Sequence, residues 1–113
     1  MSGLGIFKSV ISAAVGGSFT SVYTTPTGKA SYLIQCDVAC IGDTGVQATI
    51  KLVKSVGGTA HLVKNVPIPV GSTLQVLDGQ KVVLESGDSL QVKCETDGET
   101  VDVIVSLVED VNL

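Results

Sequence analysis

Short runs of alternating apolar and polar residues, separated by turn residues, dominate the chain from Ser18 onward. The pattern is densest over residues 66–94, which contain three short apolar runs. Turn residues separate these runs: Pro and Gly before the first, Asp-Gly before the second and Ser-Gly-Asp before the third. Evenly spaced short strands with such turns are typical of an all-β sandwich or barrel. Strands are predicted at 18–24, 30–41, 46–54, 59–66, 74–77, 81–84, 90–94 and 99–109.

This pattern predicts an all-β fold: a two-sheet antiparallel β-sandwich of jelly-roll type with about eight strands. An immunoglobulin-like sandwich is the alternative. That fold normally carries a Trp in its core, and this chain has no Trp.

The first 17 residues follow a different pattern. Their apolar positions have the i, i+3, i+4, i+7 spacing of a short amphipathic helix and are Ile6, Phe7, Val10, Ile11, Ala14 and Val15. The same residues also suit an extended arm. We therefore predict an apolar N-terminal arm or short helix at 1–17 and a β-sandwich domain at 18–113. The arm would pack on its own domain or on a neighbour, and deleting it is expected to leave the sandwich folded.

The last predicted strand is apolar on one face and half apolar on the other. Val101, Val103, Val105 and Leu107 form the first face, and Asp102, Ile104, Ser106 and Val108 form the second. A strand that is apolar on both faces is usually covered on both. The candidate assembly interface therefore combines the arm with this second face and comprises Leu4, Ile6, Phe7, Val10, Ile11, Val15, Ile104 and Val108.

The longest predicted strand, residues 30–41, also alternates. The alternation places Gln35 and Asp37 on the outside. The positions expected to face the core are Tyr32, Ile34, Cys36, Val38 and Cys40.

Composition adds a reason to expect neighbours. The chain is 44% hydrophobic and only 16% charged, and its mean hydropathy is +0.47. This is more apolar surface than one small core needs, which favours a homo-oligomer, with a valine-rich monomeric core as the alternative. The net charge is −4 and all seven basic residues are scattered Lys, so nucleic acid is not an expected partner. No apolar run reaches the ~20 residues of a membrane span, and the N-terminus lacks the charged start of a cleaved signal peptide.

Three cysteines, Cys36, Cys40 and Cys94, argue against a disulfide framework because their number is odd. On one strand, Cys36 and Cys40 would lie ~13 Å apart, beyond the ~7 Å limit for the Cα atoms of a disulfide. We expect three buried free thiols and folding in a reducing cytoplasm.

Residues suited to catalysis are scarce, and no enzyme is predicted. His61 is the only imidazole and is expected on the surface, and no nucleophile with an adjacent base stands out. The carboxylates Asp78, Glu85, Asp88, Glu95, Asp97 and Glu99 lie in or near turns. They lack the spaced pattern of a calcium loop, and turn geometry explains the Asp residues. We expect no catalytic residue, no cofactor and no metal site.

Three phrases carry a family resemblance: SFTSVYTTPTGKASYLIQCDVAC at 18–40, LVKNVPIPVGSTLQVLDGQKVVLESGDSLQVK at 62–93, and VDVIVSLVE at 101–109. They resemble small β-sandwich virion proteins of tailed bacteriophages, especially of marine and cyanobacterial phages. The resemblance implies a structural role in the virion, and no catalytic or ligand residue comes with it.

Within that family, a capsid decoration (cement) protein on the outside of the head is the preferred hypothesis. It would be a homo-oligomer, with a trimer favoured, and would contact the major capsid protein or other virion proteins. The alternatives are a neck, tail or fibre component, or a non-enzymatic ligand-binding β-sandwich module.

Overall fold

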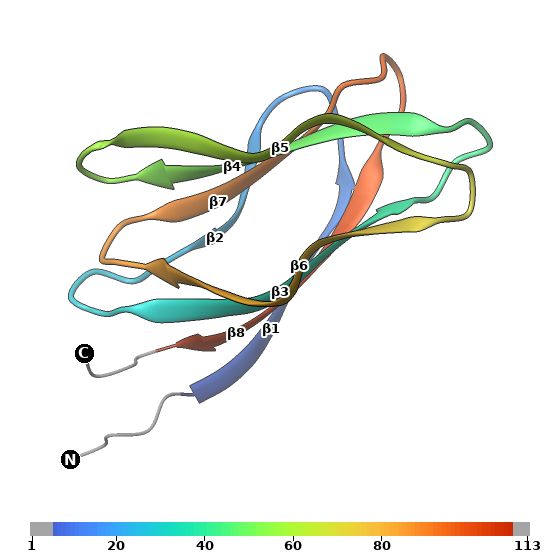
Figure 1. Cartoon of the computed structure of the whole chain (residues 1–113). Helices are drawn as coiled ribbons and strands as arrows, with labels where there is room; N and C mark the ends of the chain where they lie inside the picture. Colours follow the sequence, from blue (N-terminus) through green and yellow to red (C-terminus); the bar gives the residue numbers. More distant parts are fainter. Residues whose placement is uncertain (1–5, 110–113) are drawn as a thin grey trace.

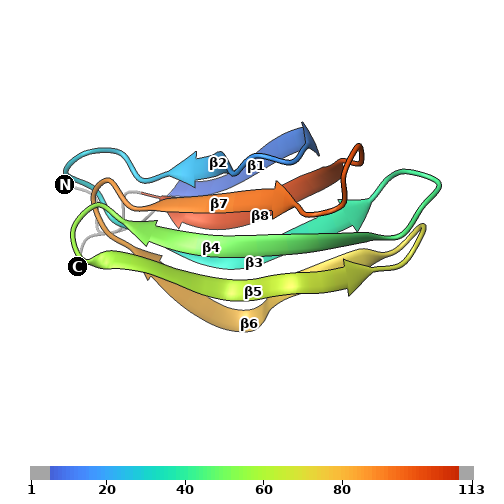
Figure 2. The same cartoon turned by 90° about the horizontal axis from the view of Figure 1, so that it is seen from above.

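The computed structural model describes residues 6–109, except for the side chains of residues 78–81, and this part of the chain contains strands and no helix. The strands are β1 (Ile6–Val15), β2 (Thr20–Thr24), β3 (Ser31–Cys40), β4 (Val46–Lys54), β5 (Gly58–Ile68), β6 (Thr73–Leu84), β7 (Ser89–Cys94) and β8 (Val101–Glu109). They form two four-stranded sheets, β1-β8-β3-β6 (sheet A) and β2-β7-β4-β5 (sheet B). The sheets stack face to face (Figures 1 and 2). The predicted two-sheet antiparallel β-sandwich is confirmed.

The strand pairs are nested along the sequence. β4 pairs with β5, β3 with β6, β2 with β7, and β1 with β8, all antiparallel. One long hairpin produces such nesting, and folding it over brings β8 beside β3 and β7 beside β4. Every connection except β4–β5 therefore crosses between the sheets. On this strand order, we assign the sandwich to the jelly-roll type.

The core lies between the two sheets, and β8 contributes its alternate residues to it. Val101, Val103 and Val105 are fully buried, and from sheet B Ile50 and Val92 are fully buried too. Burial of such side chains is the main stabilising contribution in a fold of this kind. The predicted alternation along β8 is confirmed, because its other positions are partly or largely exposed.

Residues 6–15 form strand β1 instead of the short helix that their spacing allowed. β1 pairs with β8 from Ile6 opposite Glu109 to Ser12 opposite Val103, and it forms one edge of sheet A. Val15 is buried in the core. Deleting residues 1–17 would therefore remove a strand and a core residue. It is expected to destabilise the sandwich instead of leaving it folded.

β6 is one continuous strand where two strands and an Asp-Gly turn were predicted. Leu33 lies opposite Val82, and Gln35 lies opposite Asp78. From Leu33 to Gln35 the chain advances by two residues on β3, whereas the paired positions on β6 are four residues apart. The extra residues of β6 form a bulge, and the predicted turn lies within it.

A second bulge lies in β3 and reverses its alternation. Leu33 pairs with Leu107 and Gln35 pairs with Ser106, which leaves Ile34 as an extra residue. Leu33 is consequently fully buried, while Ile34 is only partly buried. The prediction that Tyr32 and Ile34 face the core is wrong, and the prediction for Cys36, Val38 and Cys40 is confirmed because all three are buried.

Candidate assembly surface

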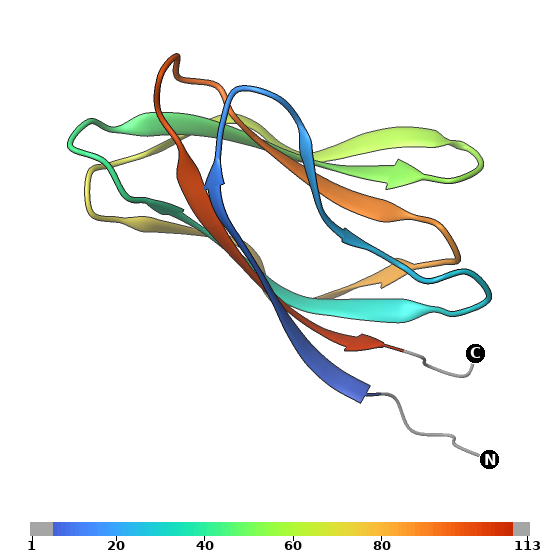
Figure 3. The ribbon, with the colours of Figure 1, turned by 180° about the vertical axis from the view of Figure 1, so that it is seen from behind.

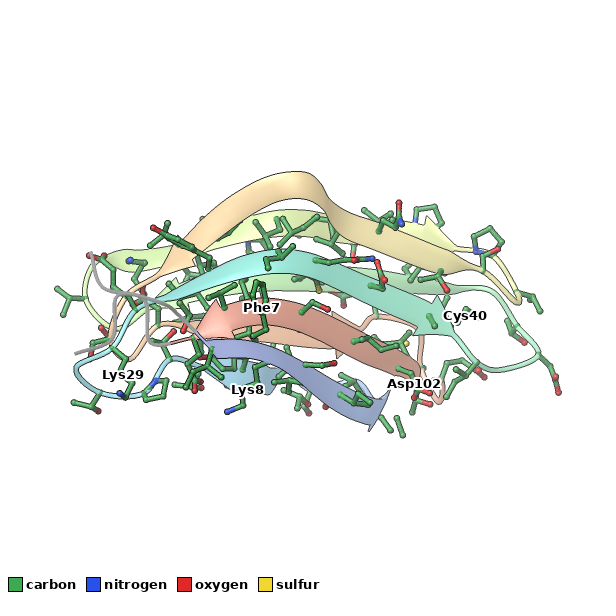
Figure 4. All side chains as sticks on the ribbon, turned by 90° about the horizontal axis from the view of Figure 1, so that it is seen from below. Phe7, Lys8, Lys29, Cys40 and Asp102 are labelled. Carbon is green, nitrogen blue, oxygen red and sulfur yellow. The ribbon has the colours of Figure 1, made fainter. Side chains whose placement is uncertain are left out.

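The outer face of sheet A carries a row of apolar side chains across all four strands. β-Sheet register places Phe7 opposite Val108, Val108 opposite Tyr32, and Tyr32 opposite Val83. Phe7 is 80% exposed and Val83 is 42% exposed. We call these four residues the apolar row. Figure 4 looks onto this face of the sandwich.

A second apolar pair lies further along the same face. Ile11 lies opposite Ile104 on neighbouring strands, and the two side chains are 70% and 48% exposed. Ser9 and Ser106 pair between them and the apolar row. The outer face of sheet A is therefore apolar at two positions along β1 and β8, namely at the apolar row and at the Ile11–Ile104 pair.

The structure brings together four of the eight predicted interface residues: Phe7, Ile11, Ile104 and Val108. Ile6 is also exposed, but it alternates with Phe7 and so lies on the other side of β1. Val15 belongs to the core, and Val10 packs against it, so neither offers a surface to a neighbour. Leu4 lies outside the described residues.

An open depression of about 330 Å³ lies in this outer face. Its lining residues are Phe7, Lys8, Ser9, Ile34, Ser106 and Leu107. The short side chains of Ser9 and Ser106 leave room between the larger Phe7 and Ile34. The bulge in β3 places Ile34 here, and a bulge leaves no mark on the alternation of the sequence. For that reason, Ile34 was missed as a surface residue.

The outer face of sheet B carries a polar row. A row runs across its four strands through Ser21, Gln91, Lys51 and His61. The aromatic ring of Phe19, the residue before β2, lies under the ammonium of Lys51 at 3.7 Å and within 5.5 Å of that of Lys93. These cation–π contacts cover its face. The two outer faces of the sandwich therefore have opposite character.

Reactive groups are held in unreactive states. All three cysteines are free and buried, as predicted. Burial, together with the nearby charge of Asp37, raises the pKa of the Cys36 thiol to about 12, so that thiol stays protonated at neutral pH. Burial and a hydrogen bond to Glu109 also raise the pKa of Tyr23 to about 12.

Sites for metals or membranes are not evident in residues 6–109. No group of three or more His, Cys, Asp or Glu side chains there could hold a metal ion. His61, the predicted surface histidine, is indeed exposed, on β5. The same residues include no helix that is long and apolar enough to cross a membrane.

Comparison with known proteins yields fold similarity alone. No family model and no curated protein matches the chain. Among solved structures, the chain is similar to a chain of the acidic stable capsid structure of Helicobacter pylori bacteriophage KHP30. The TM-score is 0.57 at 6% identity, over 94% of this chain and 88% of that one.

A pentameric capsid protein isolated from metagenomic phage sequences is similar at a TM-score of 0.44 and 17% identity. That match covers 91% of this chain and 60% of the other. The similarity to the phage KHP30 chain shows a shared β-sandwich fold.

Proposed function

We propose that this chain is a structural component of a bacteriophage virion, and that it is a capsid decoration (cement) protein on the outside of the head. The observation that carries the proposal is the contrast between the two outer faces of the sandwich. Sheet A exposes the apolar row and the Ile11–Ile104 pair, whereas sheet B exposes polar side chains. Large exposed apolar patches mark protein interaction sites. Sheet A would thus face the shell or other subunits, and sheet B would face solvent.

The fold supports this placement. Jelly rolls recur in viral capsid domains, and the fold is shared over most of its length with a chain of a phage capsid. The three phrases that resemble tailed-phage virion proteins span most of the sandwich.

The proposed partners are other copies of the chain and the major capsid protein. A trimer was favoured from the sequence, and the oligomer would stabilise the shell by linking neighbouring capsid subunits. A neck, tail or fibre component is the second candidate, because an apolar sheet face suits any assembly. The two placements differ in copy number per particle.

Binding of the purified full chain to heads that lack it tests the proposal. Ile104→Lys places a charge on the outer face of sheet A, where the side chain is 48% exposed. It should leave the fold intact and weaken binding at least tenfold, because the lysine would have to be buried in the contact. Gln91→Lys is the matched control, since Gln91 occupies an outward position in the middle of sheet B, and it should bind like the wild type.

Circular dichroism and thermal unfolding would first establish that both variants are folded. Equal binding by both variants and the wild type would overturn the assignment of sheet A as the shell-facing surface. Loss of binding by Gln91→Lys alone would overturn it too, because it would place sheet B against the shell.

A further inference from the structure

The four edge strands of the sandwich are not equally protected. β1 and β6 are the edges of sheet A, and β2 and β5 are the edges of sheet B. An edge strand offers unpaired backbone N–H and C=O groups to any other strand. Bulges, prolines or a short length protect such edges from pairing with another chain. β6 contains two register shifts against β3, and the short β2 contains one against β7. β5 carries Pro67 and has Asn65 at φ 52°.

β1 is the exception among the described strands. β1 has a register shift of its own between Ser12 and Val15, with Ala14 at φ 56°, but both lie at its end. Residues 6–12 pair with β8 without a register shift and form the outer rim of sheet A (Figure 3). This segment exposes Ile6, Phe7 and Ile11. Its one charged residue, Lys8, forms an ion pair with Glu109 at 3.5 Å. Lys8 alternates with Phe7 and therefore lies on the other side of the strand. A regular apolar edge of this kind is a template for another strand.

We propose that β1 pairs antiparallel with β1 of a second copy of this chain, about a two-fold axis at Ser9. Each copy offers one unprotected edge among the strands described. Two copies can therefore pair only through the same edge, which gives a closed, isologous dimer. A ring of three would need two different surfaces on each copy, so this pairing favours a dimer over the trimer considered above.

The side chains select this register. With Ser9 on the axis, Phe7 lies opposite Ile11 of the partner subunit, and Ile11 lies opposite Phe7 of the partner subunit. An axis at Lys8 would set two ammonium groups directly against each other, which is destabilising. An axis at Val10 would place Phe7 opposite Ala13 of the partner subunit and lose both large apolar pairs.

The surface available is sufficient for a weak, specific contact. The exposed parts of Ile6, Phe7 and Ile11 amount to roughly 350 Å² per copy, or about 700 Å² for two copies. Paired backbones and flanking side chains bring the buried area to about 1,000 Å², the lower limit for a specific interface. The apolar row would then continue across the axis onto Ile11 and Ile104 of the partner subunit.

Disulfide trapping tests both the contact and its register. In Ser9→Cys, the two new cysteines would lie opposite each other with Cα atoms about 4.5–5.5 Å apart, within the range of a disulfide. The native cysteines are buried and should not compete. In the control Ala13→Cys, also exposed on β1, the two sites would lie about 27 Å apart. Mild oxidation of the purified full chain should link Ser9→Cys into dimers and leave Ala13→Cys monomeric.

A second substitution separates the proposed contact from random collision. Ile11→Lys added to Ser9→Cys should reduce the disulfide yield at least tenfold. Val56→Lys added instead should leave the yield unchanged, because Val56 is 86% exposed in the turn between β4 and β5. An unlinked Ser9→Cys, equal linking of Ala13→Cys, or a trimeric native mass of the wild type would overturn the proposal. No capsid is present in these assays, so they are independent of the proposed virion role.

Discussion

Asp88 joins turns at one end of the sandwich, where the connections β2–β3, β4–β5 and β6–β7 lie together (Figure 1). Its Oδ1 accepts a hydrogen bond from the backbone N–H of Ser55 at 2.9 Å, and its Oδ2 accepts one from that of Glu85 at 2.9 Å. The Lys54 ammonium also donates to Oδ2. The backbone carbonyl of Asp88 accepts from the N–H of Thr25 at 2.9 Å. One residue that is 1% exposed thus links all three turns.

These contacts set the charge state of Asp88. Burial by itself would raise its pKa, but the hydrogen bonds from Lys54, Ser55 and Glu85 outweigh burial and lower the pKa below its usual value. A carboxyl group whose pKa is lower in the folded state stabilises the fold at pH values above its unfolded pKa of about 3.9. That contribution is lost as the pH falls through the folded pKa.

Asp88→Asn keeps the volume of the side chain and removes its charge. An amide NH₂ replaces one accepting oxygen, so at least one backbone N–H loses its acceptor and the Lys54 ammonium loses its ionic partner. Hydrogen bonds to charged groups contribute about 1.5–3 kcal/mol each, and relaxation of the partly exposed Lys54 recovers part of the loss. We expect the free energy of unfolding to fall by about 2–4 kcal/mol near pH 7. The control Asp43→Asn, in the exposed β3–β4 turn, should change it by less than about 0.5 kcal/mol.

Urea unfolding near pH 7 and near pH 2 provides the measurement. The difference between the wild type and Asp88→Asn should be smaller at the lower pH, because the charge of Asp88 contributes less to stability once the pH falls below the unfolded pKa. An equal difference at both pH values would refute the reasoning, since it would mean that the charge of Asp88 contributes nothing.

Two further predictions concern the core. Leu33→Ala should lower the free energy of unfolding by about 2–5 kcal/mol, and Ile34→Ala should lower it by less than about 1 kcal/mol. The reason is that the bulge in β3 buries the Leu33 side chain and turns the Ile34 side chain outward. Equal losses for the two variants in urea unfolding would contradict the bulge. A thiol reagent near pH 8 should modify none of the three cysteines in the native protein and all three in denaturant, because they are buried and the pKa of Cys36 is about 12. A fast-reacting thiol in the native chain would contradict the assigned burial.

Local periodicity was sufficient for the strands whose alternation is unbroken. The predicted ranges 46–54, 90–94 and 99–109 agree within two residues with β4, β7 and β8. These strands lie in the interior of their sheets, where one face of each strand meets the core. Under those conditions, the two-residue period of the sequence reports the structure directly.

β1 and β6 show why the same reasoning failed elsewhere. In β1, the adjacent pairs Ile6-Phe7 and Val10-Ile11 send one apolar residue to each side of an edge strand. Adjacent pairs at this spacing also fit a helix, so the sequence supports both structures equally. In β6, the Asp-Gly dipeptide at 78–79 has turn chemistry, but pairing with β3 absorbs it as a bulge. Only the partner strand decides between these outcomes.

The candidate surface was found in part for the same reason. Phe7 and Ile11 could be proposed as apolar positions of the N-terminal arm, and Ile104 and Val108 because they break the expected polar pattern of an outer face. Tyr32 and Val83 were missed as members of the apolar row. Their places depend on which residues of β3 and β6 lie opposite Val108, and that register is set by bulges far apart in the sequence.

The most direct test of the proposed virion role is the copy number of this chain in purified particles of a phage whose genome carries its gene. Quantitative mass spectrometry would give its ratio to the major capsid protein in the same particles. A capsid decoration protein should be present at a number of the same order as the major capsid protein. A handful of copies would contradict the decoration role and favour the neck, tail or fibre, and complete absence from the particles would contradict the virion role itself.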